Sequence, residues 1–73
     1  NEKNKENIII SDVALKIKQL REQKHITQEV FFFDTGIHIA RIESGKANIT
    51  ITTLKKICDY FEISLSDFFS DIV

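Results

Sequence analysis

The sequence predicts an all-α domain built from five short helices. Three observations lead to this fold class: apolar residues recur at three- and four-residue steps, no hairpin turn of the Asn-Gly kind occurs, and the 73 residues include no Pro and only two Gly. Hydrophobic residues make up 42% of the chain and charged residues 29%, which is typical of a packed globular domain. A chain of this length supports one small domain.

The first helix is predicted to start at Ser11 or Asp12, either of which can cap it, and to end near Lys24. Before it, residues 1–7 are polar and lack periodicity, so we expect a flexible N-terminal arm over residues 1–10, followed by a folded domain over residues 11–73. The apolar face of this helix comprises Val13, Ala14, Ile17 and Leu20.

The second helix is predicted to follow Thr27, a good N-cap residue, and it contains the consecutive residues Phe31–Phe33. Neighbouring side chains on a helix project about 100° apart, so the three rings cannot all face one core. We therefore expect at least one of these Phe side chains at the edge of the domain.

A third helix is predicted around residues 36–44, after a turn cluster that contains Gly36. Asp34 or Thr35 is expected to cap it, and Gly45 is expected to end it in the left-handed conformation. Its apolar residues are Ile37, Ile39 and Ile42.

The last two helices are predicted over residues 50–61 and after Ser64, which begins a sequence like a capping box. Cys58 lies on the apolar stripe of the fourth helix, where a small buried hydrophobe is the ordinary explanation. The stripe comprises Leu54, Ile57, Cys58 and Phe61, and the fifth helix carries Leu65, Phe68 and Phe69.

Composition excludes several functional classes. Ten Lys and Arg against eleven Asp and Glu give a net charge of −1, so any attraction to nucleic acid must come from a local patch. The single cysteine can form neither an internal disulfide nor a structural zinc site. No stretch of about 18 apolar residues is present to span a membrane. We expect a soluble cytoplasmic protein with no membrane partner and no cofactor.

Four segments in order resemble the DNA-binding domain of the phage-repressor, Cro-like or Xre type. They are VALKIKQLREQ, ITQE, IARIESGK and NITITTLKKICDYFEISLSDFF, and together they cover roughly residues 13–69. The resemblance implies a helix-turn-helix, in which the second helix enters the major groove and the first crosses the DNA backbone. The motif is about three residues shorter than usual in this sequence, Phe31 and Phe32 replace a Leu-Ala pair, and Ile49 replaces a loop Pro.

The resemblance also implies which residues contact DNA. Arg41 can donate two parallel hydrogen bonds to guanine O6 and N7, although a surface Arg that pairs with a neighbour is the alternative. Gln28, with Thr27, is expected to hold a phosphate at a helix N-terminus. The further candidates are Thr35, Gly36 and Ile37 at the groove-facing helix start, and His38 and Lys46 at phosphates. For His38 and Lys46, a solvated side chain without DNA contact is the alternative. Because Gly36 and Ile37 offer no side-chain hydrogen bond, we expect the protein to depend more on recognition of DNA shape.

Arg21 and Glu43 are expected to form a structural ion pair, since the resemblance implies that an Arg late in the first helix holds the Glu that ends the recognition helix. No Gly-rich phosphate loop or Ser-His-Asp set is present, and the two His residues have no metal-ligand spacing. We therefore expect no catalytic activity and no metal site.

The C-terminal residues carry more apolar surface than a five-helix domain needs, which favours a homodimer that binds two half-sites. They are Phe68, Phe69, Ile72 and Val73. In the alternative, Phe68 completes the core and the last residues fray.

The sequence is thus interpreted as a sequence-specific transcriptional regulator of the repressor kind, which binds double-stranded DNA in the nucleoid. A further protein partner is also expected, for example a toxin or an antirepressor. The alternative is a protein-interaction module that keeps the scaffold and has lost DNA binding, as the acidic balance and the exposed Phe residues favour.

Overall fold

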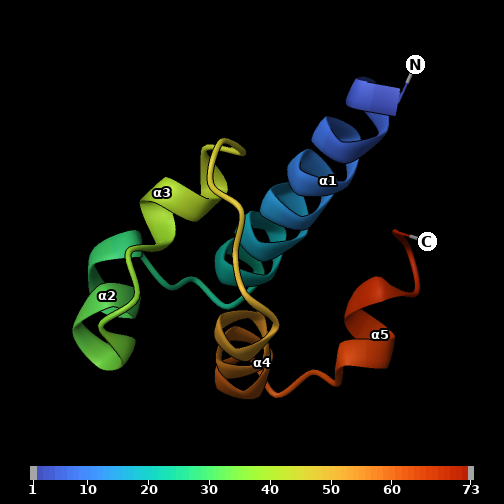
Figure 1. Ribbon diagram of the computed structural model, residues 1–73. Coiled ribbons are helices and arrows are strands. Elements are labelled where there is room, and N and C mark those ends of the chain that lie inside the picture. The colour runs from blue at the N-terminus through green and yellow to red at the C-terminus, as the bar shows by residue number, and fades with distance from the viewer. Residues whose placement is uncertain (1, 73) are drawn as a thin grey trace.

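Five α-helices make up the fold in the computed structural model, which describes residues 2–72 and the side chains from Ile9 onward (Figure 1). The described part contains no strand, so the predicted all-α fold is confirmed. Nor does this part include a helix that is long and apolar enough to cross a membrane. The helices are α1 (Glu2–Gln23), α2 (Gln28–Thr35), α3 (Ile39–Glu43), α4 (Ile51–Tyr60) and α5 (Leu65–Phe69). α3 packs against both α1 and α2, and α5 packs against α4.

α1 begins at Glu2, which corrects the predicted start at Ser11 or Asp12. Both of those residues lie inside the helix, and residues 2–10 are its first turns. The stretch before Ser11 contains Glu and Lys and neither Gly nor Pro, so nothing in it breaks a helix, and a residue that can cap need not do so. Asn1 lies outside the described residues, and the flexibility of the arm stays a prediction.

α1 and α4 end in the same way, and in both the second residue after the helix has a positive φ without being glycine. His25 and Glu62 each have φ of 57°. The amide of the next residue, Ile26 or Ile63, donates to the carbonyl five residues earlier, at 3.1 and 3.0 Å. Both Ile side chains pack against the core, so each turn closes with an apolar contact.

α2 is capped as predicted. The Thr27 hydroxyl accepts a hydrogen bond from the amide of Val30 at 3.1 Å. At the other end Gly36 adopts the left-handed conformation, with φ of 74°, and its amide donates to the carbonyl of Phe32 at 2.7 Å. α2 therefore runs up to Gly36.

The predicted helix over residues 36–44 is shorter in the structure, where α3 begins at Ile39. Neither Asp34 nor Thr35 caps it, because both belong to α2. The Thr35 hydroxyl donates to a carbonyl one turn earlier in α2 and accepts from an amide in the following turn. Since Gly36 ends α2, the residues up to Ile39 form the turn between the two helices.

The remaining predicted helix ends are confirmed. Gly45 has φ of 76° just after α3. The Thr50 hydroxyl accepts from the amide of Thr53 at 3.1 Å and caps α4, and the Ser64 hydroxyl accepts from the amide of Asp67 at 3.0 Å and caps α5.

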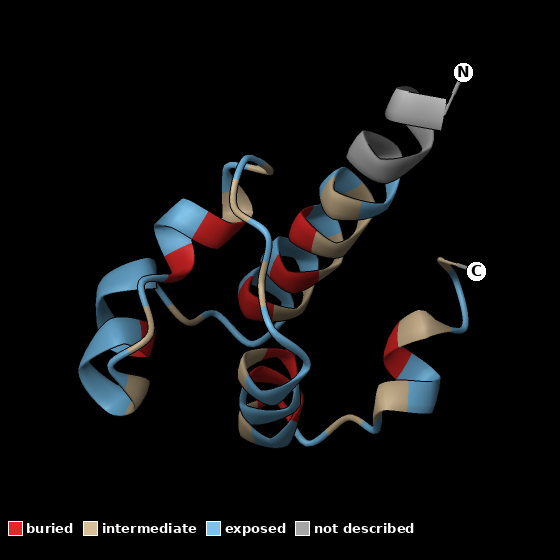
Figure 2. Cartoon of the chain, viewed as in Figure 1, coloured by how far each residue is buried: buried red, intermediate tan, exposed pale blue. Residues whose placement is uncertain are grey.

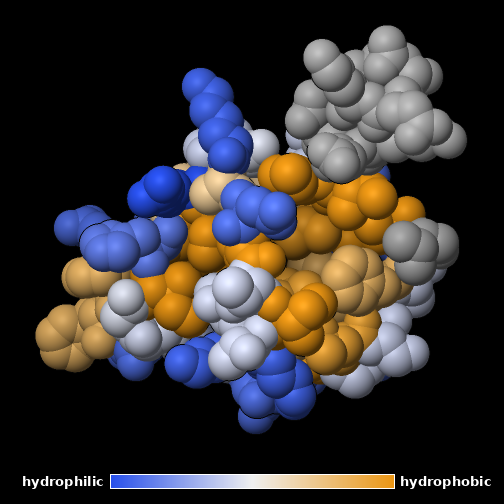
Figure 3. All heavy atoms as spheres, viewed as in Figure 1, coloured by the Kyte–Doolittle hydropathy of each residue, from blue (hydrophilic) through white to orange (hydrophobic). Residues whose placement is uncertain are grey.

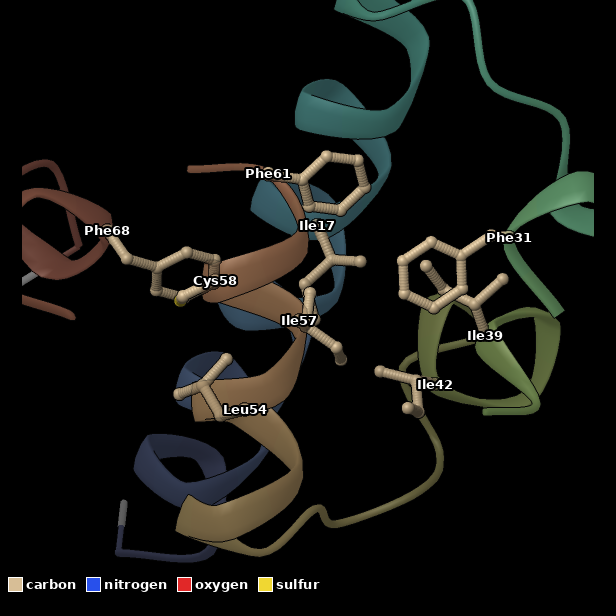
Figure 4. Close-up of a cluster of buried hydrophobic side chains, with 9 residues drawn as sticks. All are labelled: Ile17, Phe31, Ile39, Ile42, Leu54, Ile57, Cys58, Phe61 and Phe68. Atoms are coloured by element: carbon tan, nitrogen blue, oxygen red, sulfur yellow. The ribbon is translucent and has the colours of Figure 1, made fainter. Parts of the chain in front are cut away.

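The core lies between α1, α2, α3 and α4, with one ring supplied by α5 (Figures 2 and 4). Phe31 is fully buried, whereas Phe32 is 44% exposed and Phe33 is 88% exposed, which confirms that the three rings do not share one core. The Phe31 ring stacks on Phe61 at 5.6 Å between centroids. The buried cluster comprises Ile17, Phe31, Ile39, Ile42, Leu54, Ile57, Cys58, Phe61 and Phe68.

The C-terminal apolar residues expose less apolar surface to solvent than the sequence indicates. Phe68 is fully buried and completes the core, and Phe69 and Ile72 are half-buried against it. Val73 lies outside the described residues. Cys58 is buried as predicted, and burial raises the pKa of its thiol.

Candidate nucleic-acid interface

A two-pronged ion pair holds α3 on α1. Arg21 Nε donates to Glu43 Oε2 at 2.7 Å, and Arg21 Nη2 donates to Glu43 Oε1 at 3.0 Å. The two side chains are only 11% and 4% exposed. Arg21 Nη1 also donates to the carbonyl of Ile26 at 2.8 Å. The hydrogen bond to Glu43 raises the pKa of Arg21 although burial opposes it, so the guanidinium stays charged.

This pair lets α3 bury one side and present the other. Ile39 and Ile42 are 1% and 8% exposed and belong to the core cluster. Ala40 and Arg41 lie between them in the sequence and are exposed, because successive side chains on a helix point about 100° apart. The guanidinium of Arg41 therefore projects from the side of α3 that faces solvent.

An open depression lies between α2 and α3. Phe32 and His38 both line this depression, with their ring centroids 4.6 Å apart and their ring planes 33° from parallel. Glu29 is the one acidic residue among those that line it. The lining residues are Gln28, Glu29, Phe32, His38, Ile39, Ala40 and Arg41.

A second depression also borders α3 and brings Arg41 together with Lys46. Both side chains are exposed, so this face carries two positive charges within one hollow. His38 borders both depressions. Polar side chains gather over α3 and the loop that follows it, at the upper left of Figure 3. The remaining lining residues are Ile42, Ala47, Asn48, Ile49, Thr50 and Thr53.

At the start of α2, Thr27 and Gln28 are exposed and partly engaged within the chain. The Thr27 oxygen caps α2, and Gln28 Nε2 donates to Glu43 Oε1 at 3.1 Å. Each still holds a hydrogen that can be donated elsewhere: the hydroxyl proton of Thr27 and a second amide hydrogen of Gln28. Their contact with a phosphate stays a prediction.

The three residues predicted at the groove-facing helix start do not lie on α3, and His38 is the N-cap residue just before it. Thr35 ends α2 and is half-buried, Gly36 forms the left-handed turn, and the Ile37 side chain packs against the core. The structure therefore separates these three from Arg41, because α2 extends through the position expected for the helix start. Their contact with DNA stays a prediction.

Sequence reasoning missed the place of Phe32 and Ala40 in the surface beside Arg41. The signal for Phe32 was the run of three aromatic residues, which required exposed rings but did not indicate which neighbours they meet. In the described residues no group of three or more His, Cys, Asp and Glu side chains could hold a metal ion.

Comparisons with known proteins agree with this geometry. The family model described as helix-turn-helix matches residues 17–68. Control protein C.MunI from a Mycoplasma species is 38% identical over 61 residues, which cover 78% of this chain and 82% of that protein. No solved structure gives a significant match.

Proposed function

The chain belongs to the helix-turn-helix family of DNA-binding transcription regulators, and from this premise we propose that α3 reads base edges in the major groove while α2 crosses the phosphate backbone. The observation that carries the proposal is the exposed guanidinium of Arg41 on a helix whose opposite side is buried. Arg41 is the one residue of α3 with hydrogen-bond donors in its side chain. Two parallel hydrogen bonds to guanine O6 and N7 favour that base by about 1–3 kcal/mol.

The proposed phosphate contacts flank this helix. Gln28 and Thr27 are at the N-terminus of α2, where backbone amides and the helix dipole also attract anions. Lys46 and His38 border the hollow beyond α3. These side chains position the protein on the duplex and carry no base information of their own. Thr35, Gly36 and Ile37 come before α3 in the chain, and their contact with the groove stays a prediction.

We further propose that the protein acts as a homodimer. Ile9 and Ile51 are 51% and 69% exposed, and together with Phe69 they line an apolar depression between α1, α4 and α5. Apolar atoms gather across the centre of the face shown in Figure 3. A dimer through this surface would present two copies of α3 to half-sites about 34 Å apart, one helical turn of DNA. Sedimentation equilibrium that shows only monomer at high concentration would remove this part of the proposal.

Regulation by repression is the mode we propose, since a dimer bound over a promoter excludes other proteins from it. We also propose that the protein acts on the bacterial nucleoid in the cytoplasm. The similar protein from Mycoplasma is named a control protein, which supports a regulatory role without specifying its sign. The interaction module without DNA binding is not favoured. A toxin or an antirepressor as a protein partner stays a prediction.

The test is selection from a pool of randomised duplexes at two salt concentrations. A specific regulator enriches a site with two-fold symmetry, and its affinity falls with salt by about 0.9 log units per log unit for each phosphate contacted. Binding that neither enriches a sequence nor depends on salt would contradict the proposed function.

A further inference from the structure

The depression between α2 and α3 contains an exposed aromatic side chain that the contacts proposed above do not use. Phe32 comes from α2, and its ring lies 4.6 Å from that of His38, centroid to centroid. With Ala40 it supplies an apolar wall beside the guanidinium of Arg41. Phe33, the next residue, is twice as exposed and does not line the depression.

The charges around the depression favour a base edge over a phosphate as its occupant. Glu29 lines the side formed by α2, and its carboxylate repels a phosphate placed there. Arg41 lines the opposite side and attracts the acceptor-rich edge of a purine. Between these two charged residues, the apolar wall of Phe32 and Ala40 favours a chemical group that forms no hydrogen bonds.

Of the groups that base pairs present in the major groove, only the C5-methyl group of thymine is apolar. It lies on the side of the groove next to its own sugar-phosphate strand. α2 crosses that backbone in the proposed binding mode, so Phe32 reaches the groove wall where the methyl group projects. Phe and Ala are among the side chains that contact this group.

We propose that this depression receives the C5-methyl group of a thymine next to the guanine that Arg41 reads, and that Phe32 is a specificity-determining residue contributed by α2. The inference rests on the proposed function and deepens it, since it names the second feature of the base sequence that the protein recognises. Contact with the His38 ring restricts the Phe32 ring before DNA arrives, so little rotational freedom is lost on binding.

The experiment starts from the duplex enriched by selection with the unaltered protein. Each thymine is replaced singly by deoxyuridine, which removes the methyl group and retains every hydrogen-bonding group. At one thymine per half-site, next to the guanine read by Arg41, affinity is expected to fall about fourfold, the value of burying one methyl-sized group. At the other thymines deoxyuridine is expected to change little.

Two variants on the same helix then identify the contact. Phe32→Ala is expected to bring the thymine-to-deoxyuridine affinity ratio close to one and to leave the salt dependence unchanged. Phe33→Ala is the matched control, because it removes an equal ring from α2 outside the depression, and it should preserve the ratio. The deoxyuridine comparison needs no variant, so it decides whether a thymine methyl group is contacted even if Phe32→Ala does not fold.

The outcomes separate the two proposals. A specific, salt-dependent site without a thymine beside the guanine, or with no thymine sensitive to deoxyuridine, overturns the methyl contact and leaves the proposed function standing. A ratio that Phe32→Ala preserves overturns the role of Phe32. The absence of any sequence-specific binding overturns both proposals.

Discussion

Removing the carboxylate of Glu43 is expected to destabilise the fold by about 3 kcal/mol. Glu43→Ala leaves the guanidinium of Arg21 buried without its two-pronged partner, and the Arg21 side chain is only 11% exposed. Breaking a buried ion pair by removing one partner costs about 3–5 kcal/mol. Because Arg21 keeps its hydrogen bond to the carbonyl of Ile26, the lower end of that range applies.

This loss is a large part of the stability of so small a domain. Marginal stability of about 5–15 kcal/mol is usual, and for domains of about 60–100 residues 1 kcal/mol shifts the melting temperature by about 4–8 °C. Glu43→Ala should therefore lower the melting temperature by about 12–24 °C. Urea denaturation followed by circular dichroism gives the free energy directly, from the change in midpoint at constant slope.

Asp59→Ala is the matched control, since it also removes the acidic residue of an ion pair, in this case a pair within one helix. Asp59 pairs with Lys55, and both side chains are more than half exposed. Such a pair contributes about 0.3–0.5 kcal/mol, so the control should change stability by no more than about 0.5 kcal/mol. If Glu43→Ala destabilises the protein no more than Asp59→Ala, the ion pair does not hold α3 on α1, and the reasoning fails.

Three further predictions concern binding, a helix end and pH. Lys46→Ala should weaken binding to all DNA sequences alike and lower the salt slope by about one, as measured by titration at several salt concentrations; a loss confined to particular bases would contradict a phosphate contact. Glu62→Gly should raise the urea concentration at the unfolding midpoint and increase the free energy of unfolding by about 1 kcal/mol, because glycine adopts the left-handed conformation after α4 without steric cost. A lower midpoint would refute this prediction. The Tyr60 hydroxyl donates to Asp34 at 2.6 Å, and this hydrogen bond raises the pKa of Tyr60. The stabilisation by this hydrogen bond is therefore present below the ordinary tyrosine pKa of about 10 and is lost as pH rises through the higher pKa of the folded state. In urea titrations at alkaline pH, the wild type should lose more stability than Tyr60→Phe. Equal losses would contradict the role of this hydrogen bond.

Features determined by neighbouring residues could be predicted from the sequence. Thr27, Thr50 and Ser64 each accept a hydrogen bond from an amide three residues later, and a cap of this kind needs only a suitable side chain and a helix after it. The buried face of α4 could be predicted as well, because its apolar residues recur at helical spacing over about two turns.

Where two local solutions compete, the sequence alone did not decide between them. Thr35 is a good N-cap residue, yet its hydroxyl bonds within α2 and the following turn, so α3 starts later than predicted. Ser11 can likewise cap a helix, but the residues before it are compatible with helix and α1 continues through them. In both cases a residue that permits a boundary does not enforce one.

Contacts between distant residues could not be predicted from spacing. The resemblance to a known family indicated that Arg21 meets Glu43, but nothing in the pattern indicated that Gln28 joins them or that the Phe32 ring meets His38. These contacts depend on how α2 and α3 lie across a shortened turn. The position of that turn determines which side chains surround Arg41.

Selection of DNA sites with wild type and Arg41→Ala in parallel measures whether α3 presents Arg41 to the major groove. Arg41 is exposed and belongs to no buried cluster, so the variant should keep its fold and its melting temperature. In the variant, one guanine position per half-site should lose its preference, at a cost of about 1–3 kcal/mol, while the preferences at the other positions are retained. Identical preferences at every position for both proteins would contradict the account.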